Sequence, residues 1–525
     1  KAALLYGVTG SGKTKVIIES CKKAISDGKT AMVLLPEIGL TAQALGIYQS
    51  VFGDRLAVVH SMLSTGERLD TYRKIDSGAV DIVIGTRSAI FSPLKNIGLI
   101  VLDEEQEYTY KSEMSPKYHT RDIARFRCNY NKAVMLLCSA TPSVESFFKA
   151  QKNVYTLIKL ENRYGDVELP NVVLADMRSE KPAENMNAIG DMLKNGINTA
   201  LSAGEQVILF ANRRGYNSRL SCMKCGYNFS CPNCSVSMTY HAYGLPYRAK
   251  KLVCHYCGYT KDVPDECPDC KSKNIGYFGY GTQKLEDELT TLFPSAKAVR
   301  MDADTTAFKS SHAEILNAFA KHEYDILFGT QMVAKGLDFP NVSLVGVINA
   351  DASLYMNDFR AGERTFSLFT QLVGRSGRSK KRGNAIIQTF SPDNEILRLA
   401  VKQDYEKFYQ SEIVLRKAVV FPPFCDIAVF SFSSQTESDT NSAALVLTCE
   451  MREYYEKNEF TFPWTLLGPY NAGILKLKNR YRQSVIIKYR DSGESRMFLQ
   501  NVYALLLKSA PTIIKIDLDI NPSIV

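Results

Sequence analysis

The chain has 525 residues and a formal net charge of +9, and 45% of its residues are hydrophobic. This length predicts several globular domains with separate cores, and the mild positive charge permits a nucleic-acid partner without requiring one. No apolar run approaches the length of a membrane span and there is no signal peptide, so we expect neither a membrane-embedded nor a secreted protein.

A glycine-rich loop from Gly7 to Thr14 lies between the first predicted strand and the first predicted helix. In a P-loop of this kind, glycines let backbone N–H groups approach phosphates, and the helix N-terminus adds positive partial charge. We expect Lys13 to bind the β- and γ-phosphates of ATP and Thr14 to bind Mg²⁺. A merely flexible loop is the alternative, and the position of Lys-Thr before a helix disfavours it. The predicted phosphate-binding glycines are Gly7, Gly10 and Gly12.

Apolar strands alternate with helical segments through the first part of the chain. The predicted strands are residues 30–36, 56–61, 81–85, 98–102 and 136–139. Such alternation predicts a doubly wound α/β layer with a parallel sheet, in which ligands lie at the carboxyl ends of the strands. We therefore assign residues 1–182 to a first, ATP-binding lobe.

Two acidic residues, Asp103 and Glu104, end one of these strands. We expect Asp103 to hold Mg²⁺, directly or through water, and Glu104 to orient and deprotonate the attacking water. A solvated acidic loop is the alternative, and the upstream P-loop favours ATP hydrolysis over it. The next strand ends in Ser139-Ala140-Thr141, whose hydroxyl groups could hydrogen-bond the acidic residues and sense the γ-phosphate.

A second α/β unit, predicted at residues 183–220 and 273–414, is interrupted by a cysteine-rich insertion at residues 221–272. The insertion contains four Cys-x-x-Cys pairs: Cys222/Cys225, Cys231/Cys234, Cys254/Cys257 and Cys267/Cys270. Two such pairs make one tetrahedral thiolate site, so the eight ligands predict two structural zinc ions. With 13 cysteines and no secretory signal, metal binding in a reducing compartment is favoured over disulfides. Spacing alone leaves open which pairs share a metal.

The second unit also contains a glycine- and arginine-rich stretch, Gln371 to Arg378. We expect Arg375 and Arg378, three residues apart, to lie on one face of a helix start. Their rigid guanidinium groups suit the γ-phosphate of a nucleotide held by the first lobe, where they would stabilise transition-state charge. Contact with a phosphate backbone is the alternative, which suits residues 380–382 better.

The last part of the chain, residues 415–525, predicts a small α+β domain that begins near the Pro-Pro sequence at 422–423. Residues 427–432 predict a strand and residues 442–455 a helix. Residues 476–488 predict a strand with one basic face. Such a face suits contact with a DNA backbone or a solvated surface about equally.

The order of the P-loop, Asp-Glu, Ser-Ala-Thr and Gln-x-x-Gly-Arg-x-Gly-Arg sequences resembles that of superfamily 2 helicases. With the cysteine-rich insertion, it resembles the primosomal protein N′ (PriA) family of bacterial replication-restart helicases. Further matching stretches are Leu35–Thr41, Gly85–Ala89, Asn212–Tyr216, Gly329–Met332, Lys335-Gly336, Asp358–Ala361 and Glu363–Thr365. The resemblance implies two RecA-like lobes with parallel sheets, and it places Gly336 at the nucleotide.

The resemblance also implies ATP-driven 3′→5′ unwinding of DNA at stalled forks and reloading of the replicative helicase through primosome proteins. Forked and single-stranded DNA and single-stranded-DNA-binding protein are implied partners, and we expect a nucleoid-associated monomer in the bacterial cytoplasm. The outer pairs, Cys222/Cys225 and Cys267/Cys270, would share one zinc, and the inner pairs the other. We expect the natural protein to extend N-terminally with DNA-binding domains.

In two places the sequence departs from the family pattern. Gln106 stands where the family usually has His, and it can still donate a hydrogen bond. An aromatic-rich loop follows, in which Ser115-Pro116 stands where we expect a glycine and a large aromatic residue. Aromatic and basic residues of this loop would stack on and contact single-stranded DNA, although they could simply pack the lobe surface. Its residues are Tyr108, Tyr110, Lys111, Tyr118, His119 and Arg121.

Two alternative functions remain for the whole chain: another superfamily 2 translocase, or a zinc-stapled DNA-binding scaffold.

Overall fold

The structure is a computed structural model in which the chain forms two compact units. One contains Lys1–Arg213 and Thr282–Val414, and the other contains Arg214–Gly281 and Leu415–Val525. The residues described are 1–36, 42–163, 170–180, 188–211, 219–222, 227, 229–233, 238–243, 249–254, 259–273, 275–278, 282–302, 311–330, 333, 339–354, 356, 358–375 and 383–524.

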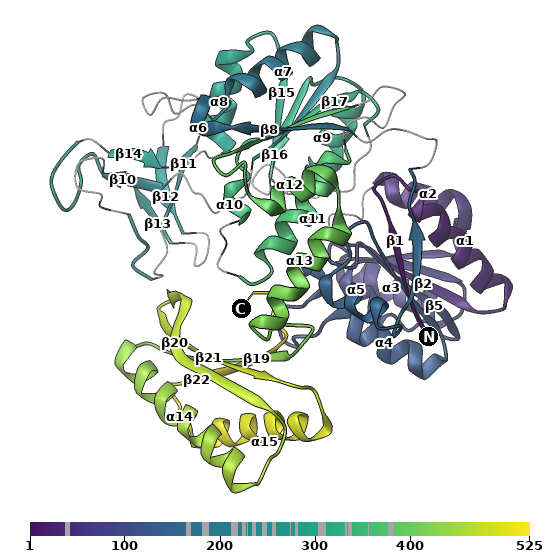
Figure 1. Ribbon diagram of the computed structural model, residues 1–525, viewed down its shortest axis with the longest axis vertical. Helices are drawn as coiled ribbons and strands as arrows, with labels where there is room; N and C mark the ends of the chain where they lie inside the picture. Colours follow the sequence, from purple (N-terminus) through teal and green to yellow (C-terminus); the bar gives the residue numbers. More distant parts are fainter. Residues whose placement is uncertain are drawn as a thin grey trace. The chain divides into compact units, whose positions relative to one another are not determined.

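The first lobe is built on a seven-stranded parallel sheet in the order β3-β4-β2-β5-β6-β1-β7 (Figure 1). Helices cover both faces, so β2 and β4 are almost wholly buried and consist of continuous apolar runs. The strands are β1 (Ala2–Gly7), β2 (Thr30–Leu34), β3 (Leu56–Val59), β4 (Ile82–Gly85), β5 (Ile97–Asp103), β6 (Val134–Ser139) and β7 (Thr156–Leu160). The helices are α1 (Lys13–Ser26), α2 (Ala42–Phe52), α3 (Thr65–Asp76), α4 (Thr120–Asn131) and α5 (Val144–Gln151). The predicted α/β lobe is confirmed.

The second lobe is a six-stranded parallel sheet in the order β15-β16-β9-β17-β18-β8. Its strands are β8 (Asn171–Asp176), β9 (Gln206–Phe210), β15 (Ala298–Met301), β16 (Ile326–Gly329), β17 (Val342–Val347) and β18 (Asn384–Thr389). Its helices are α6 (Met177–Glu180), α7 (Asp191–Ser202), α8 (Thr282–Leu292), α9 (Ser311–Ala320), α10 (Asp351–Leu354), α11 (Ala361–Val373), α12 (Glu395–Lys402) and α13 (Tyr405–Ala418).

One prediction about the lobe limits differs from the structure. We assigned residues up to 182 to the first lobe, but β8 is hydrogen-bonded in parallel to β18 of the second sheet. The short strand completes the edge of that sheet. Sequence alone cannot show this, because its partner lies some two hundred residues further along the chain.

Aromatic side chains join the two lobes into one buried core. Tyr405 at the start of α13 packs against Tyr6 and Phe147 of the first lobe, with ring centroids 5.4 and 5.1 Å apart. On the second-lobe side, Phe366 of α11 stacks on Phe408 at 4.5 Å. Figure 1 shows α13 running beside α5 as a result. The lobes are therefore held together by apolar packing as well as by polar contacts.

The cysteine-rich insertion is a five-stranded antiparallel sheet in the order β13-β12-β11-β10-β14. Its strands are β10 (Arg219–Cys222), β11 (Thr239–Tyr243), β12 (Ala249–Val253), β13 (Thr260–Asp262) and β14 (Ile275–Phe278). The sheet is small, and its apolar cluster consists of a few side chains around Leu252. Because its core is small, a module of this size needs additional stabilisation, such as a structural metal ion or disulfides.

The C-terminal domain is a four-stranded antiparallel sheet in the order β20-β21-β19-β22. Two helices pack on one face of it (Figure 1). The elements are β19 (Asp426–Ser434), α14 (Glu437–Lys457), β20 (Trp464–Leu477), β21 (Arg480–Tyr489), α15 (Gly493–Ser509) and β22 (Lys515–Ile520). The predicted α+β class is confirmed.

The prediction of a single strand at residues 476–488 is wrong. Lys478 and Asn479 have φ angles of 50° and 59°, and they form the two-residue turn between β20 and β21. Two consecutive left-handed residues match the twist of a tight hairpin, and Asn tolerates this conformation well. The alternating basic residues therefore lie on two antiparallel strands rather than along one face.

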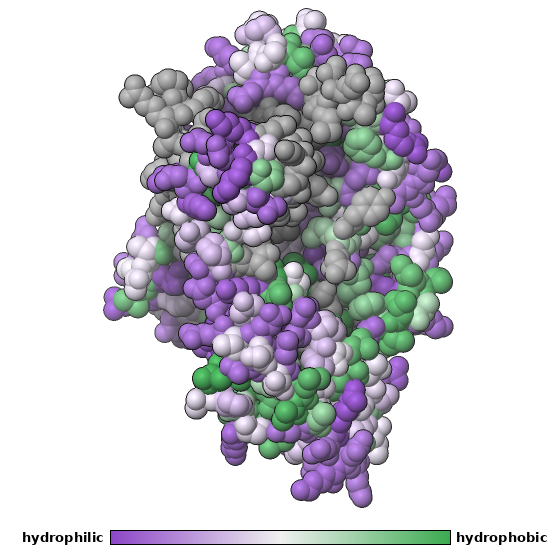
Figure 2. Space-filling view, turned by 90° about the vertical axis from the view of Figure 1, so that its left-hand side faces the viewer, coloured by the Kyte–Doolittle hydropathy of each residue, from purple (hydrophilic) through white to green (hydrophobic). Residues whose placement is uncertain are grey.

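The surface is mostly hydrophilic on the face drawn in Figure 2, where hydrophobic residues form small separate patches. Among the described residues, no helix is both long and apolar enough to cross a membrane.

Candidate nucleotide site and cysteine-rich module

The loop between β1 and α1 has the backbone that a phosphate-binding loop requires. Gly10 and Gly12 have φ angles of +81° and +85°, which only glycine adopts without strain. A Cβ at Gly7 would come within 2.5 Å of the Ser11 hydroxyl oxygen. Gly12 also offers no side-chain hydrogen bond to the first turn of α1. The helix therefore begins with backbone N–H groups that could donate hydrogen bonds to an anion.

Polar side chains of this loop could donate hydrogen bonds to a polyphosphate. The Lys13 ammonium group donates to the carbonyl oxygen of Gly7 at 2.8 Å, so it lies inside the loop. The buried hydroxyl groups of Thr9 and Ser11 have no hydrogen-bond partner among the described atoms. A phosphate chain would supply acceptors for all three groups, and the exposed Thr14 follows directly. The residues present therefore fit ATP.

The acidic pair lies at the carboxyl end of β5. Burial, together with the neighbouring Glu104 carboxylate, raises the pKa of Asp103 to about 7, against the opposing effect of Lys13. The positive charge of Lys13 therefore does not fully offset burial and the Glu104 carboxylate. A divalent cation at this carboxylate would supply further positive charge. Glu104 adopts a left-handed backbone with φ of 47°, so it turns away from the strand directly after Asp103. The donor set therefore fits Mg²⁺ as well.

A chain of hydrogen bonds runs from the first lobe through Glu104 to the second. Ser139 at the end of β6 donates to Gln106 at 2.6 Å, and Gln106 donates to the Glu104 carboxylate at 2.9 Å. From the second lobe, the Gln371 side chain donates to the same carboxylate oxygen at 3.1 Å. Gln106 thus donates the hydrogen bond that its amide allows, as expected where the family usually has His.

Helix α11 faces the first lobe with three polar side chains spaced four residues apart. Glu363 accepts from the backbone N–H of Val144 at 2.9 Å, and Ser367 shares a 2.7 Å hydrogen bond with Thr141. Gln371 is the third. Residues at this spacing lie along one face of a helix, so α11 contacts both the acidic pair and the segment after Ser-Ala-Thr.

Helix α13 adds one contact to the same segment. The Tyr405 hydroxyl group donates to the carbonyl oxygen of Pro142 at 2.7 Å. Together with the contacts of Glu363 and Ser367, this bond ties residues 141–144 of the first lobe to the second. Sequence reasoning gave these three side chains no role. The four-residue spacing of Glu363, Ser367 and Gln371 was the available signal, whereas Tyr405 offered none.

Residues Gln371–Val373 of the predicted arginine stretch form the last turn of helix α11. The predicted helix start depends on residues up to Arg378, of which 376–378 lie outside the described residues. Helix α11 ends at Val373, and Gly374 is its C-terminal cap. A Cβ on Gly374 would come within 2.6 Å of the Thr9 side chain, so this part of the second lobe lies against the P-loop. Arg375 follows directly and is partly exposed. Outside the described residues lie Arg378 and Gly336.

Three residues of the predicted DNA-sensing loop pack within the lobe instead: Tyr110 and Lys111 are buried, and the Arg121 side chain is 18% exposed. Tyr110 is 1% exposed, and its hydroxyl lies 2.7 Å from the Asp103 carbonyl oxygen. The Arg121 guanidinium group pairs with the buried Glu105 carboxylate at 3.0 Å. These side chains stabilise the lobe behind the acidic pair and cannot stack on a base. Tyr108 is 42% exposed, and the Arg364 guanidinium group lies 5.8 Å from the centre of its ring.

The described cysteines of the insertion are reduced. Cys231, Cys254 and Cys267 are buried and Cys270 is partly exposed, and none of the four forms a disulfide. Cys231 and Cys254, one cysteine from each inner pair, belong to the same small cluster. The Cys267 carbonyl accepts from Lys271 at 3.0 Å, which makes the tight turn of a metal-binding knuckle. Buried thiols held in such turns fit zinc. Not described are the side chains of Cys222, Cys225, Cys234 and Cys257.

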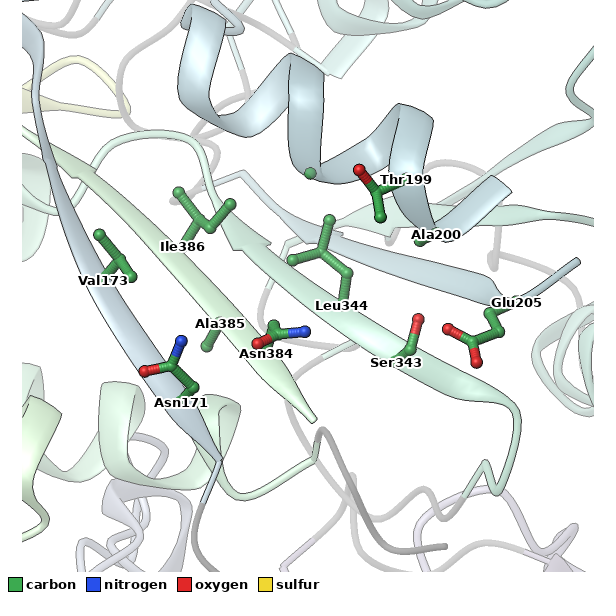
Figure 3. A pocket seen from close by; sticks show the side chains of 11 residues that line it. Asn171, Val173, Thr199, Ala200, Glu205, Ser343, Leu344, Asn384, Ala385 and Ile386 are labelled. Carbon is green, nitrogen blue, oxygen red and sulfur yellow. The ribbon is translucent and has the colours of Figure 1, made fainter. Parts of the chain in front are cut away.

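A cavity of about 250 Å³ lies elsewhere in the second lobe, between α7 and the strands β8, β18 and β17 (Figure 3). Asn171, Asn384 and Ser343 line it at the amino ends of these parallel strands. Small residues opposite them, such as Gly196 and Ala200, leave the space open. Because ligands of such sheets bind at the carboxyl ends, this cavity is not the nucleotide site.

Comparisons with known families place the chain in a class first. Residues 1–148 match the DEAD/DEAH box helicase family, and residues 269–380 match the helicase conserved C-terminal domain. The two lobes and the P-loop thus define a helicase core, whose ATPase domains imply ATP and Mg²⁺. Residues 231–261 match the PriA DNA helicase Cys-rich region domain, which implies zinc, and residues 417–523 match the primosomal protein N C-terminal domain.

Relatives then define the family. The chain is 43% identical over 522 residues to replication restart protein PriA of Bacillus subtilis, covering 99% of the chain and 64% of that protein. It is 37% identical to the Chlamydia pneumoniae protein of the same name, over 99% of the chain and 68% of that protein. The chain belongs to the PriA family of replication restart proteins, and it spans under two thirds of the Bacillus relative.

Among solved structures, the chain is similar to RecG bound to a three-way DNA junction. The TM-score is 0.46 and the identity 16%, over 78% of this chain and 43% of RecG. This likeness is too distant to add to the assignment.

Proposed function

We propose that the chain is the motor part of an ATP-dependent 3′→5′ DNA helicase. It would act on forked and single-stranded DNA at stalled or abandoned replication forks and restart replication through primosome assembly. One observation carries the motor part of this proposal. The Glu104 carboxylate receives hydrogen bonds from both lobes, through Gln106 and Gln371, beside a P-loop with the backbone of a phosphate site.

The chemistry assigned to the first lobe is ATP hydrolysis. The loop glycines and α1 would bind the phosphates, and Lys13 would exchange its Gly7 carbonyl for the β- and γ-phosphates. Asp103 and Thr14 would hold Mg²⁺, which neutralises phosphate charge when bound. Glu104 would accept the proton of the attacking water, while Gln106 and Gln371 fix its orientation.

The second lobe would complete the site when the nucleotide binds. Arg375 follows Gly374, which lies against Thr9 of the P-loop, so its guanidinium group can approach the γ-phosphate. Arg378 would act beside it, and Gly336 would line the same site. Cationic groups from a second lobe stabilise transition-state charge and report on the nucleotide state. Loss of the γ-phosphate would remove this attraction and let the lobes separate, which gives a movement that can translocate DNA.

The cysteine-rich module would hold two structural zinc ions. The shared cluster of Cys231 and Cys254 supports one site made by the inner pairs. The outer pairs, Cys222/Cys225 and Cys267/Cys270, would make the other. Metal analysis should find two zinc ions per chain, and a disulfide-bonded insertion without metal would overturn this assignment. We propose residues 221–272 as the limits of the module and 415–525 as those of the C-terminal domain.

The proposed partners follow from the family. Primosome proteins and single-stranded-DNA-binding protein would assemble with the chain, which would act as a monomer near the nucleoid in the bacterial cytoplasm. Sedimentation and pull-down with purified single-stranded-DNA-binding protein would test these points. A stable dimer in sedimentation would contradict the monomer. Failure to pull down single-stranded-DNA-binding protein would contradict that partner.

Unwinding of a labelled fork with a 3′ single-stranded arm tests the activity directly. We expect ATP-dependent strand separation by a full-length protein, and ATP turnover by this chain that DNA stimulates more than RNA. Equal stimulation by RNA would favour another superfamily 2 translocase. ATP turnover that is absent in the wild type, or unchanged in Lys13→Ala and Glu104→Gln, would favour a DNA-binding scaffold.

A further inference from the structure

The turn of the β20–β21 hairpin contacts the cysteine-rich module at one of its knuckles. The backbone N–H of Asn479 donates to the carbonyl oxygen of Asn233 at 2.8 Å. The Lys476 ammonium group donates to the carbonyl oxygen of Pro232 at 3.1 Å. Pro232 and Asn233 are the two residues between Cys231 and Cys234. Both carbonyl oxygens at the centre of the knuckle therefore accept hydrogen bonds from one hairpin of the C-terminal domain, which is far away in sequence.

An apolar contact accompanies the two hydrogen bonds. Leu477, next to the turn, packs against the small core of the module. That core consists of Phe229, Cys231, Met238, Leu252 and Cys254. The cluster has few members, so the leucine is a sizeable part of its cover. The hairpin thus contacts the backbone and the core of the module at the same place.

Two basic residues of the hairpin, Lys476 and Arg480, are engaged within the protein. Besides Pro232, Lys476 lies 5.0 Å from the ring centre of Tyr481. The Arg480 guanidinium group donates to the carbonyl oxygens of Ser433 and Ile513. These contacts hold the hairpin in shape and direct its tip at the knuckle. They disfavour the interpretation of this stretch as a DNA-backbone contact.

We propose that the β20–β21 turn is a docking element that holds the C-terminal domain on the Cys231–Cys234 knuckle, and that this docking depends on bound metal. The hairpin donates hydrogen bonds to the adjacent carbonyl oxygens of Pro232 and Asn233. The backbone between the two cysteines sets the directions of these carbonyl groups. Thiolate ligation at both ends would fix that backbone. The metal dependence rests on the zinc site proposed above, whereas the docking itself rests on the contacts alone.

Hydrogen exchange of the whole chain, read by mass spectrometry, tests the docking. In Leu477→Asp we expect exchange at the 476–480 turn and at 229–233 to become at least about tenfold faster, because a charge at this partly buried apolar contact opposes docking. The control Leu507→Asp changes a leucine of α15 that is 53% exposed and should leave both segments unchanged. Amides of β19, within the domain's own core, should stay protected in both variants. Unchanged exchange in Leu477→Asp would overturn the proposal.

A second variant separates docking from DNA binding. Lys476→Met keeps the aliphatic stem and removes the ammonium group. We expect faster exchange at 229–233 and an unchanged salt dependence of DNA affinity. A shallower salt dependence with unchanged exchange would instead show that Lys476 contacts DNA phosphates, and would overturn its role here.

Zinc removal tests the metal dependence. A chelator in excess should release zinc and accelerate exchange at the 476–480 turn as Leu477→Asp does, while α14 and β19 keep their protection. Added zinc should restore the slow exchange. Zinc release without any change at the turn would refute the metal dependence. Because no ATP turnover is measured, failure here is distinguishable from failure of the helicase proposal.

Discussion

The two parallel sheets are built alike, but they contribute to the candidate nucleotide site in different ways. The first sheet contributes from its strand ends, with the P-loop after β1, the acidic pair after β5 and Ser139 at the end of β6. The second contributes from the side of helix α11 and the first residue of α13. A shared fold therefore does not give a shared role, because function depends on which residues the fold positions.

This difference predicts a ranking of mutational effects. Groups of the first lobe would touch the nucleotide and the attacking water, so their loss should stop the reaction. Described groups of the second lobe act through hydrogen bonds to the first, and a neutral hydrogen bond contributes about 1 kcal/mol net. Their loss should weaken coupling between the lobes without abolishing hydrolysis.

The largest effect is expected at the two charged residues of the first lobe. Lys13→Ala should lose most ATP affinity, and Glu104→Gln should bind ATP while hydrolysing it about 10²–10⁴-fold more slowly. Nucleotide-binding titrations and steady-state turnover would measure both. Lys15→Ala, on the exposed side of the same helix, is the matched control and should behave as the wild type. Comparable turnover in Glu104→Gln and the wild type would contradict the assignment.

A smaller but large effect is expected where the lobes touch. Gly374→Val would push its side chain into Thr9, since even a Cβ would come within 2.6 Å. Displacing the second lobe by about 1 Å should cost about 10²-fold in turnover, mainly in kcat. Gly66→Val on α3, where a Cβ meets nothing within 4 Å, is the control. Equal turnover of the two variants would show that lobe contact at Gly374 is unimportant.

A moderate effect is expected at the hydroxyl pair between the lobes. Ser367→Ala and Thr141→Val each remove one side of a buried 2.7 Å hydrogen bond. Each should lower DNA-stimulated turnover by about fivefold, and the double variant should be no worse than either single one. A double-mutant cycle on turnover would measure this coupling. Strictly additive losses would mean that the two residues act independently.

The smallest effect is expected at Tyr405. Tyr405→Phe keeps the ring in the aromatic core and removes the hydroxyl that binds Pro142. Unfolding of the two-lobe unit should lose about 1 kcal/mol, because the Pro142 carbonyl remains buried without that donor. Denaturant titration would measure the loss, with the exposed Tyr130→Phe as control. A loss of several kcal/mol would indicate that the hydroxyl does more than hold this segment.

The contributions of the first lobe could be predicted from the sequence, and those of the second mostly could not. Asp103 ends β5 and Lys13 follows β1 after a short glycine-rich loop, so local pattern and spacing place both residues at one edge of a sheet. Tyr405 and Ser367 act across an interface between segments more than two hundred residues from their partners. Such contacts depend on how two packed bodies meet, which no local pattern encodes.

The hairpin of the C-terminal domain illustrates the same limit. Residues 476–488 have the alternation of one strand, but a turn at Lys478-Asn479 divides them. Gly468, Pro469 and Gly473 argue against a strand, yet all three lie within β20. Pairing with β21 outweighs the low strand propensity of these residues. Register shifts in the pairing accommodate them within β20. The cysteine pairs, by contrast, could be recognised because a two-residue spacing of cysteines is typical of zinc ligands.

The most direct test of the account is an experimental structure of this chain with Mg²⁺ and a non-hydrolysable ATP analogue. We expect the triphosphate in the β1–α1 loop, with the Lys13 ammonium group moved from Gly7 to the phosphates and Arg375 reaching the γ-phosphate from the second lobe. A nucleotide bound elsewhere, or bound in the loop with Arg375 directed away from it, would contradict the two-lobe site.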